Sequence, residues 1–225
     1  MNRLILICLL PILFSFTFSP MTSTLNLKED GNKAQFQLKN TTNKPIPIVI
    51  SIKSRIQNED GSEDLPNTDK FQVIPPQLIV PPNDQRTIRL KWEGEKNFDI
   101  EKSFRVIAEQ VPLNIEKEKK SGIQLLLKYQ AALYVISKEV KADLKVIKFK
   151  NGKKLKVWIK NFGSAHQYLN DMTLSFSFKK QSLNVPKKEL KKLDGQNILA
   201  KTTRVFEFSN LAGLNKSFKA KVKTK

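Results

Sequence analysis

The chain has 225 residues and carries 40 Lys or Arg against 21 Asp or Glu, a net charge of +19 at neutral pH. This length allows one large domain or two ordinary ones. The basic excess would suit nucleic acid, an anionic surface or an acidic partner. Because the lysines are scattered through strand-like segments and form no single basic arm, we treat the charge as a modifier of binding and expect no nucleic-acid partner.

Residues 1–15 have the pattern of a signal peptide. Arg3 gives a positive start, and the apolar run from Leu4 to Phe14 is too short for a bilayer-crossing helix of about 20 residues. Cleavage near Ser15 would remove Cys8, the single cysteine, so the mature chain would hold no disulfide. Its net charge would be +18, from 39 basic and 21 acidic residues. We expect an exported protein with no membrane span after removal of the signal.

Short alternating segments separated by turn signals predict an all-β fold from residue 16 onward. Residues 57–68 are acidic and rich in turn formers, so we expect an exposed loop there. Pro75 and Pro76 cannot donate to a β-ladder and should lie at a strand start, an edge or a bulge. Trp92 is expected in core or rim packing. The expected strands before residue 138 lie at 16–27, 34–38, 46–56, 71–80, 87–92, 104–111 and 121–135.

The segment 121–135 allows two interpretations. Ile123, Leu125 and Leu127 share one face of an extended strand, while Leu126 breaks the alternation on the other face. It is either a core strand of a sandwich or an edge strand whose apolar face is offered to another protein.

A second set of strands follows an expected hinge at residues 138–141. Its apolar residues alternate at 155–159 and 174–178, and two further strands are expected at 205–208 and 218–222. Seven strands in about 120 residues are typical of an immunoglobulin-like sandwich, although the usual Cys…Trp…Cys signature is missing. We therefore predict two such domains, residues 16–138 and a smaller one at 139–225 bent off the first.

Catalytic chemistry has little support in this sequence. His166, the single histidine, lies in a polar stretch and is expected to be a surface loop residue. No cluster of His, Cys or carboxylates has metal-site spacing, and the acidic run 59–64 lacks the spacing of a calcium loop. The glycines form no phosphate-binding loop. We expect a protein that is not an enzyme and has no metal or cofactor.

Residues 16–137 contain an ordered set of motifs. They are Phe71-x-Val73-x-Pro75-Pro76, Leu78-x-Val80-x-Pro82, Gln85, Ile88-Arg89-Leu90, Glu101-x-x-Phe104-Arg105, Glu109-Gln110-x-Pro112 and Leu133-Tyr134-Val135. In order and spacing this set resembles the PapD-like periplasmic pilus chaperones. The start Phe18-Ser19-Pro20-Met21 and the strand near residue 105 look closer to the archaic-type branch. The second domain resembles the family only in size and strand pattern.

The resemblance implies a boomerang of two immunoglobulin-like domains in the bacterial periplasm. Such a chaperone would cap pilin-like subunits that lack a strand and deliver them to an outer-membrane usher. It would donate its seventh strand, with Ile123, Leu125 and Leu127 entering the subunit groove. Each of these side chains, once buried, would contribute roughly 1.5–3 kcal/mol to the free energy of binding, before the cost of ordering the chain is subtracted. Unloaded, the chaperone could dimerise through that strand.

The sequence departs from the family at the site that holds the subunit's terminal carboxylate. The family's Arg and Lys are replaced by Thr22 and Ala132. Arg105 and Lys128 are candidate anchors, because Arg105 can fork onto a carboxylate and Lys128 shares strand parity with Ala132; each could instead belong to a surface or structural charge pair.

A second departure concerns the network between the family's two domains. Ile136 replaces the interdomain arginine, and Glu101 matches that arginine's acidic partner.

A second class of function remains open from the sequence. The chain could be a secreted, basic immunoglobulin-like adhesion or matrix module that binds an anionic surface. The segment 121–135 would then be a paired core strand, and the purified protein would be a monomer without a bound subunit.

Overall fold

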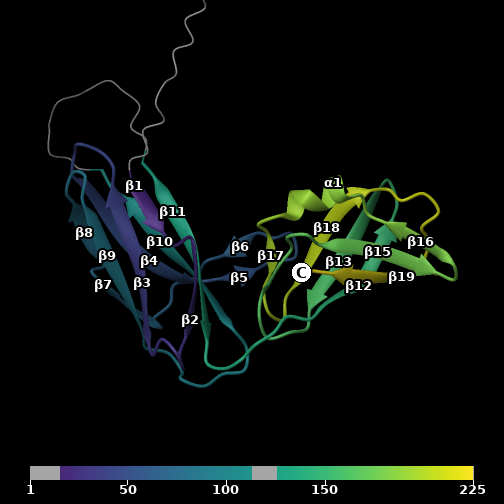
Figure 1. Cartoon of the computed structure of the whole chain (residues 1–225), viewed down its shortest axis with the longest axis horizontal. Coiled ribbons are helices and arrows are strands. Elements are labelled where there is room, and N and C mark those ends of the chain that lie inside the picture. The colour runs from purple at the N-terminus through teal and green to yellow at the C-terminus, as the bar shows by residue number, and fades with distance from the viewer. Residues whose placement is uncertain (1–15, 113–125, 225) are drawn as a thin grey trace, which may run out of the picture.

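The computed structural model describes residues 16–112 and 126–224 and consists of two β-sandwich units set at an angle to one another (Figure 1). The predicted all-β fold with two immunoglobulin-like sandwiches is confirmed. In the described part the helical elements are α1 (Lys187–Leu190) and a 3-10 turn (Lys191–Leu193). No helix within the described ranges is long and apolar enough to cross a membrane. The predicted signal peptide, residues 1–15, lies outside the described residues.

Two sheets form the first unit. One has the order β1 (Phe16–Ser19), β3 (Lys33–Asn40), β9 (Gln85–Trp92), β7 (Phe71–Ile74). The other has the order β2 (Thr22–Asn26), β11 (Lys128–Ile136), β10 (Lys102–Gln110), β4 (Ile46–Ser54), β8 (Gln77–Val80). Within the two sheets β2 and β11 pair in parallel, and the other neighbours are antiparallel.

Prolines lie where the chain passes from one sheet to the other. The segment expected as one strand from residue 16 to 27 is divided at Pro20, because β1 and β2 belong to different sheets. Pro75 and Pro76 separate β7 from β8 in the same way, as expected of residues that cannot donate to a ladder.

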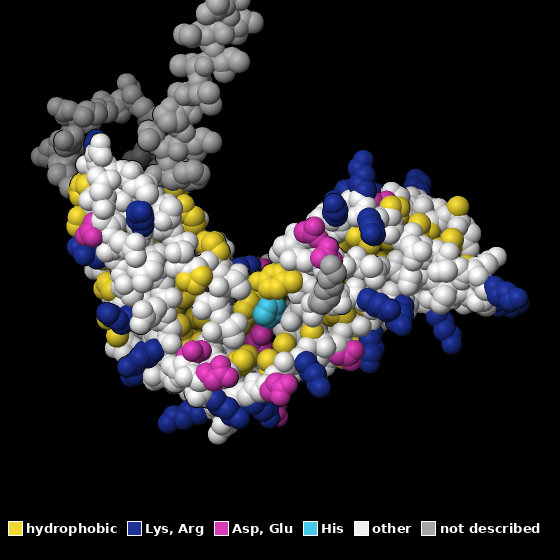
Figure 2. Space-filling view, viewed as in Figure 1, with side chains coloured by type: hydrophobic (Ala, Val, Ile, Leu, Met, Phe, Trp, Pro, Cys, Tyr) yellow, Lys and Arg dark blue, Asp and Glu magenta, His cyan; other side chains and the backbone are white. Residues whose placement is uncertain are grey.

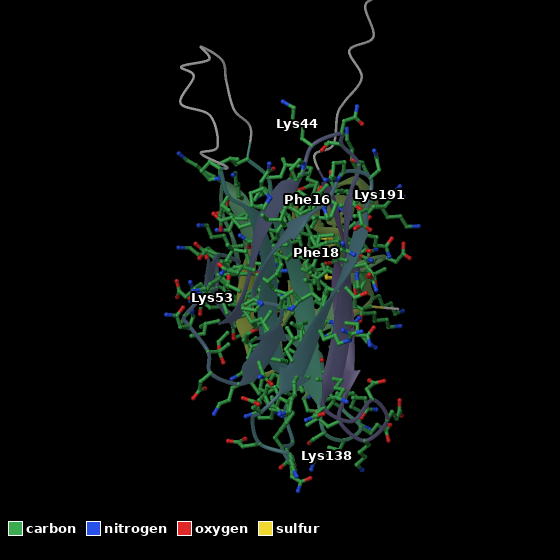
Figure 3. All side chains as sticks on the ribbon, turned by 90° about the vertical axis from the view of Figure 1, so that its left-hand side faces the viewer. Phe16, Phe18, Lys44, Lys53, Lys138 and Lys191 are labelled. Carbon is green, nitrogen blue, oxygen red and sulfur yellow. The ribbon has the colours of Figure 1, made fainter. Side chains whose placement is uncertain are left out.

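The core of the first unit follows the alternation seen in the sequence. Ile46, Ile48, Ile50 and Ile52 of β4 are all buried, and so are the apolar residues of β3 and β9. Trp92 is 3% exposed and its ring meets those of Phe71 and Phe104 edge-on, at 5.0 and 5.7 Å between centroids. The prediction that Trp92 packs in the core is confirmed. Figure 3 shows Lys44 and Lys138 at opposite ends of this unit.

The second unit repeats the plan with shorter strands. One sheet has the order β12 (Leu144–Asn151), β13 (Lys154–Asn161), β18 (Thr203–Ser209), and the other β16 (Gln181–Asn184), β15 (Thr173–Phe178), β19 (Lys219–Lys223). A short pair, β14 (Gln167–Tyr168) and β17 (Asn197–Ile198), lies beside them. The two units have separate hydrophobic cores, one from Phe16 to Val135 and one from Leu155 to Phe218.

The expectation of an exposed loop at residues 57–68 is wrong at Gln57, which is buried, and at Glu63, which is half-buried. The segment forms a hairpin of β5 (Ile56–Gln57) and β6 (Glu63–Asp64) that reaches the second unit. Gln57 is 8% exposed because its amide donates to Asn197 O at 3.1 Å and accepts from Leu199 N at 3.0 Å. A polar side chain is buried here because the other unit satisfies it.

A buried asparagine ends β3 of the first unit and another ends β13 of the second. Asn40 is fully buried, donates to three carbonyls of residues 44, 80 and 81 at 2.7–3.1 Å, and accepts from Thr42 N. Asn161 is also fully buried, donates to Ala165 O and Ile198 O, and accepts from the backbone N–H of Asp143 and Gly163. One amide thus satisfies several loop groups that have no ladder partner.

We expect Asn40→Ala and Asn161→Ala each to lower the free energy of unfolding by about 2–3 kcal/mol, because several buried carbonyls and N–H groups lose their partners. Urea denaturation measures the change. Asn43→Ala is the control, since Asn43 is exposed in the same turn as Asn40 and its loss should stay within about 0.5 kcal/mol. Equal effects at residues 40 and 43 would contradict the interpretation.

Candidate functional site in the cleft between the units

The two units enclose a hollow at their junction (Figure 2). A cavity of about 430 Å³ lies there, open to solvent and lined by both units. The first unit contributes Met21, Thr22, Arg55, Arg105, Gln130, Ala132 and Tyr134; the second contributes Tyr168, Asn170, Gly195 and Asn197.

Strand pairing gathers the first unit's cleft residues. Thr22 lies opposite Ala132 in the parallel β2–β11 pair, and Ala132 lies opposite Arg105 in the β10–β11 pair. Alternation directs Gln130, Ala132 and Tyr134 of β11 to the cleft, while the residues between them enter the core. Arg105 therefore stands beside the two positions where the resemblance leads one to expect charge.

One carboxylate holds two arginines at this site. Glu63 Oε2 accepts from Arg105 Nε at 2.8 Å and Glu63 Oε1 from Arg105 Nη2 at 2.7 Å. Arg55, whose side chain is 4% exposed, donates to Glu63 Oε1 from Nε at 2.8 Å and lies 2.6 Å away through Nη2. Burial acts to raise the pKa of Glu63, but the bonds from Arg105 and Arg55 outweigh it and lower that pKa below its usual 4.5. The trio keeps one excess positive charge at the cleft.

Arg55 also ties the first unit to the second. Its Nη1 donates to the Tyr134 hydroxyl at 3.1 Å, and its Nη2 donates to Asn197 Oδ1 at 3.1 Å. Asn197 Nδ2 donates to the same hydroxyl at 2.7 Å. Burial, with a hydrogen bond that Tyr134 donates to Tyr168, raises the pKa of Tyr134, so the phenol stays protonated. All hydrogen-bonding nitrogens of Arg55 thus have partners.

His166 lies in a loop, as predicted, but its side chain is mostly buried between the two units and not free at the surface. Its ring stacks on Tyr134 at 3.7 Å between centroids, and its Nδ1 lies 2.9 Å from both carboxylate oxygens of Glu101. The His166 backbone N–H donates to the same carboxylate at 3.1 Å. Glu101 therefore has a partner from the second unit, although Ile136 stands where the resemblance leads one to expect an arginine. The contacts are between units, which is why the local polarity of residues 163–167 did not predict them.

The structure separates the two candidate anchors. Arg105 lines the cleft, whereas Lys128 pairs with Glu109 at 2.9 Å on the surface and is not among the cleft-lining residues. Leu127 is half-buried against the first core. Ile123 and Leu125 lie outside the described residues. The sequence did not predict that Arg55 and Glu63 belong to the site. The one local signal for them was that Arg55 lies at the end of an expected strand, just before an acidic turn.

One edge of β11 is only partly covered. The pairing with β2 begins at Ala132, where Ala132 N donates to Met21 O at 2.9 Å. From Lys128 to Ala131 the strand pairs with β10 alone among the described strands. The carbonyl of Leu127 accepts from the N–H of Gln110 on β10. Because successive residues of a strand direct their backbone groups to opposite sides, the N–H and C=O groups of Lys128 and Gln130 point to the open side. A further strand could add there.

Metal chemistry has no visible ligand set in this part of the molecule. Within residues 16–112 and 126–224 no three His, Cys, Asp or Glu side chains lie close enough to hold a metal ion.

We expect Glu63→Gln to lower the free energy of unfolding by about 2–4 kcal/mol near neutral pH, because Arg55 would be left buried without a countercharge. The lowered pKa means that Glu63 stabilises the fold above about pH 4.5 and that this contribution is lost as the pH falls through the lowered pKa. The variant should therefore lose part of the acid sensitivity of the wild type.

Urea denaturation across the acid range tests both expectations. Asp64→Asn is the control, because Asp64 is the exposed neighbour on the same strand and contacts neither arginine in the described structure. Parallel pH profiles for wild type and Glu63→Gln would refute the assignment.

This chain is similar to a known protein family in sequence and to several solved structures in fold. A family model described as pili and flagellar-assembly chaperone, PapD N-terminal domain, matches residues 17–140. No curated protein is similar enough in sequence to count as a match.

Among solved structures, a chain of the CsuC–CsuE chaperone–tip adhesion subunit complex of archaic Csu pili from Acinetobacter baumannii matches with a TM-score of 0.63 and 16% identity, over 89% of this chain and 90% of that chain. The class 5 fimbriae chaperone CfaA matches with 0.60 and 16%, over 93% and 99%. The SafA pilin–SafB chaperone complex of Salmonella enterica gives 0.56 and 20%, over 89% and 86%. At these identities the likeness shows a common fold. The family model covers more than half of the chain, and the chain belongs to the pili and flagellar-assembly chaperones of the PapD type.

Proposed function

We propose that this protein is a periplasmic chaperone of a chaperone–usher pathway that caps pilin-like subunits and delivers them to an outer-membrane usher. Family membership supports the general role, and the signal-like residues 1–15 support export. The observation that carries the binding mode is the open edge of β11 at Lys128–Ala131, directly above the cationic cleft.

The proposed binding mode is strand addition. A subunit that lacks one strand exposes an open edge and an apolar groove, and both are aggregation hazards until they are covered. Lys128 and Gln130 offer backbone groups to such an edge. The sequence alternation gives Ile123 and Leu125 the same face of this stretch, and these two side chains are the ones proposed to enter the groove. Leu127 follows them on that face and is half-buried against the first core.

The proposed anchor for the subunit's terminal carboxylate is Arg105. Two of its nitrogens bind Glu63, and within the described residues Nη1 has no hydrogen-bond partner. The excess positive charge of the Arg55–Glu63–Arg105 trio favours an anion at this point. Arg105 also lies where β2 begins to cover β11, so a carboxylate held there would mark the end of the added strand.

The first test is a pull-down of tagged protein from the periplasm of the source organism. Leu125→Glu should lose a small β-rich subunit that wild type retains, because a charge cannot enter an apolar groove. Leu126→Glu is the matched control, since Leu126 has the opposite parity and is 41% exposed; it should retain the subunit. Circular dichroism checks that all three fold.

Two results would refute strand donation. One is that no subunit is pulled down with the wild type. The other is that all three proteins pull down the same partners. Either one would favour the basic adhesion or matrix module that binds an anionic surface.

A second test separates the two candidate anchors. We expect Arg105→Gln to weaken subunit binding by about ten- to a hundredfold, because a charge-assisted hydrogen bond contributes about 1.5–3 kcal/mol. Lys128→Gln should change it by less than about threefold, because its pair with Glu109 is a solvent-exposed one. Titration of the purified subunit, refolded in the presence of each variant, measures both. A larger loss at Lys128 than at Arg105 would reverse the assignment.

A further inference from the structure

The positive charge is concentrated in the second unit. Residues 16–138 contain 18 basic and 15 acidic residues, a net charge of +3, whereas residues 139–225 contain 21 basic and 6 acidic residues, a net charge of +15. A uniform lysine bias in composition would charge both units alike. In Figure 2 Lys and Arg side chains project from the upper, lower and outer margins of the second unit.

The outer face of the β12–β13 ribbon, which we call the lysine face, carries a dense part of this charge. It consists of Lys145, Lys148, Lys150, Lys156 and Lys160. Strand register places Lys145 opposite Lys160 and Lys150 opposite Lys156. Like charges directly opposite each other destabilise a sheet, so the needs of the fold do not explain this arrangement.

Few acidic side chains neutralise the lysine face. Asp143 pairs with Lys145 at 3.0 Å, and Glu207 pairs with Lys156 at 2.8 Å. Within the described residues Lys148, Lys150 and Lys160 have no acidic partner. Each Lys–Lys pair therefore keeps one uncompensated ammonium group at the surface.

Aromatic and aliphatic side chains lie among these lysines. Lys148 Nζ is 4.7 Å from the centre of the Trp158 ring, and Lys160 Nζ is 5.0 Å from the centre of the Phe162 ring. Phe162 is 41% exposed and Ile147, at the bulge of β12, is 50% exposed. The face thus combines cations with side chains that suit a membrane–water interface.

We propose that the lysine face binds an anionic phospholipid surface, independently of the subunit-binding function. The charge is carried by lysine, with one arginine, Arg204, in residues 139–225, and that arginine is 7% exposed. The lysine ammonium is a hydrated point charge on a long side chain, which suits a layer of anionic headgroups that move laterally. A site for one defined phosphate or carboxylate is more often built from arginine, whose guanidinium can donate two parallel hydrogen bonds. The five lysines lie on the outer face of two neighbouring strands, which suits a planar partner.

Vesicle sedimentation tests the proposal with phosphatidylcholine alone and with phosphatidylcholine mixed with phosphatidylglycerol. Wild type should sediment only with the anionic vesicles and should be released by salt. The triple variant Lys148→Gln/Lys150→Gln/Lys160→Gln should bind about tenfold more weakly or worse. The control Lys33→Gln/Lys39→Gln/Lys44→Gln removes the same charge from exposed positions of the first unit and should change binding less than about twofold.

Tryptophan fluorescence gives a second readout that needs no charge change. Trp92 is buried in the first core, so a blue shift on addition of anionic vesicles would report Trp158. Trp158→Phe should abolish the shift while the protein still sediments. Equal losses for the two triple variants, or no binding of wild type to anionic vesicles, would overturn the proposal, and the pull-down of the subunit is unaffected by either result.

Discussion

The geometry of the cleft depends on the buried guanidinium of Arg55. It contacts Glu63 of its own unit, the Tyr134 hydroxyl on β11 and Asn197 of the second unit, and its side chain is 4% exposed. A buried cation is tolerated only where its hydrogen bonds are all satisfied, and here they are satisfied by groups from three separate stretches of chain. The position of the β5–β6 hairpin, the orientation of Tyr134 and the place of Asn197 are thereby coupled.

This coupling makes the cleft cationic without charge at the two positions where the resemblance leads one to expect it. Thr22 and Ala132 are uncharged, yet the cleft is cationic, because Arg105 stands one strand away from Ala132 and Arg55 lies behind it. Similarly, Ile136 stands where the resemblance leads one to expect an interdomain arginine, and His166 contacts Glu101 from the second unit. In both cases the polar contact comes from another part of the chain: from β10 at the cleft, and from the loop before β14 at Glu101.

Most of the fold could be predicted from the sequence, because the alternation of apolar and polar residues along a strand depends only on that strand. The alternation at residues 34–38, 46–52 and 155–159 predicted the buried faces of β3, β4 and β13 correctly. It failed for Gln57 and His166, whose neighbours are polar but whose partners come from the other unit. Arg105 could be proposed from its strand, whereas Glu63 could not, because nothing near residue 63 indicates that two arginines will meet there.

The parallel pairing of β2 with β11 has a consequence for register. Backbone hydrogen bonding along a sheet edge repeats every two residues and does not by itself distinguish one alignment from the next. Here the open stretch ends abruptly at Ala132, where β2 takes over the edge. A strand that adds to β11 cannot move past this point without displacing β2, so the covered half of the edge limits the alignment of the open half in one direction.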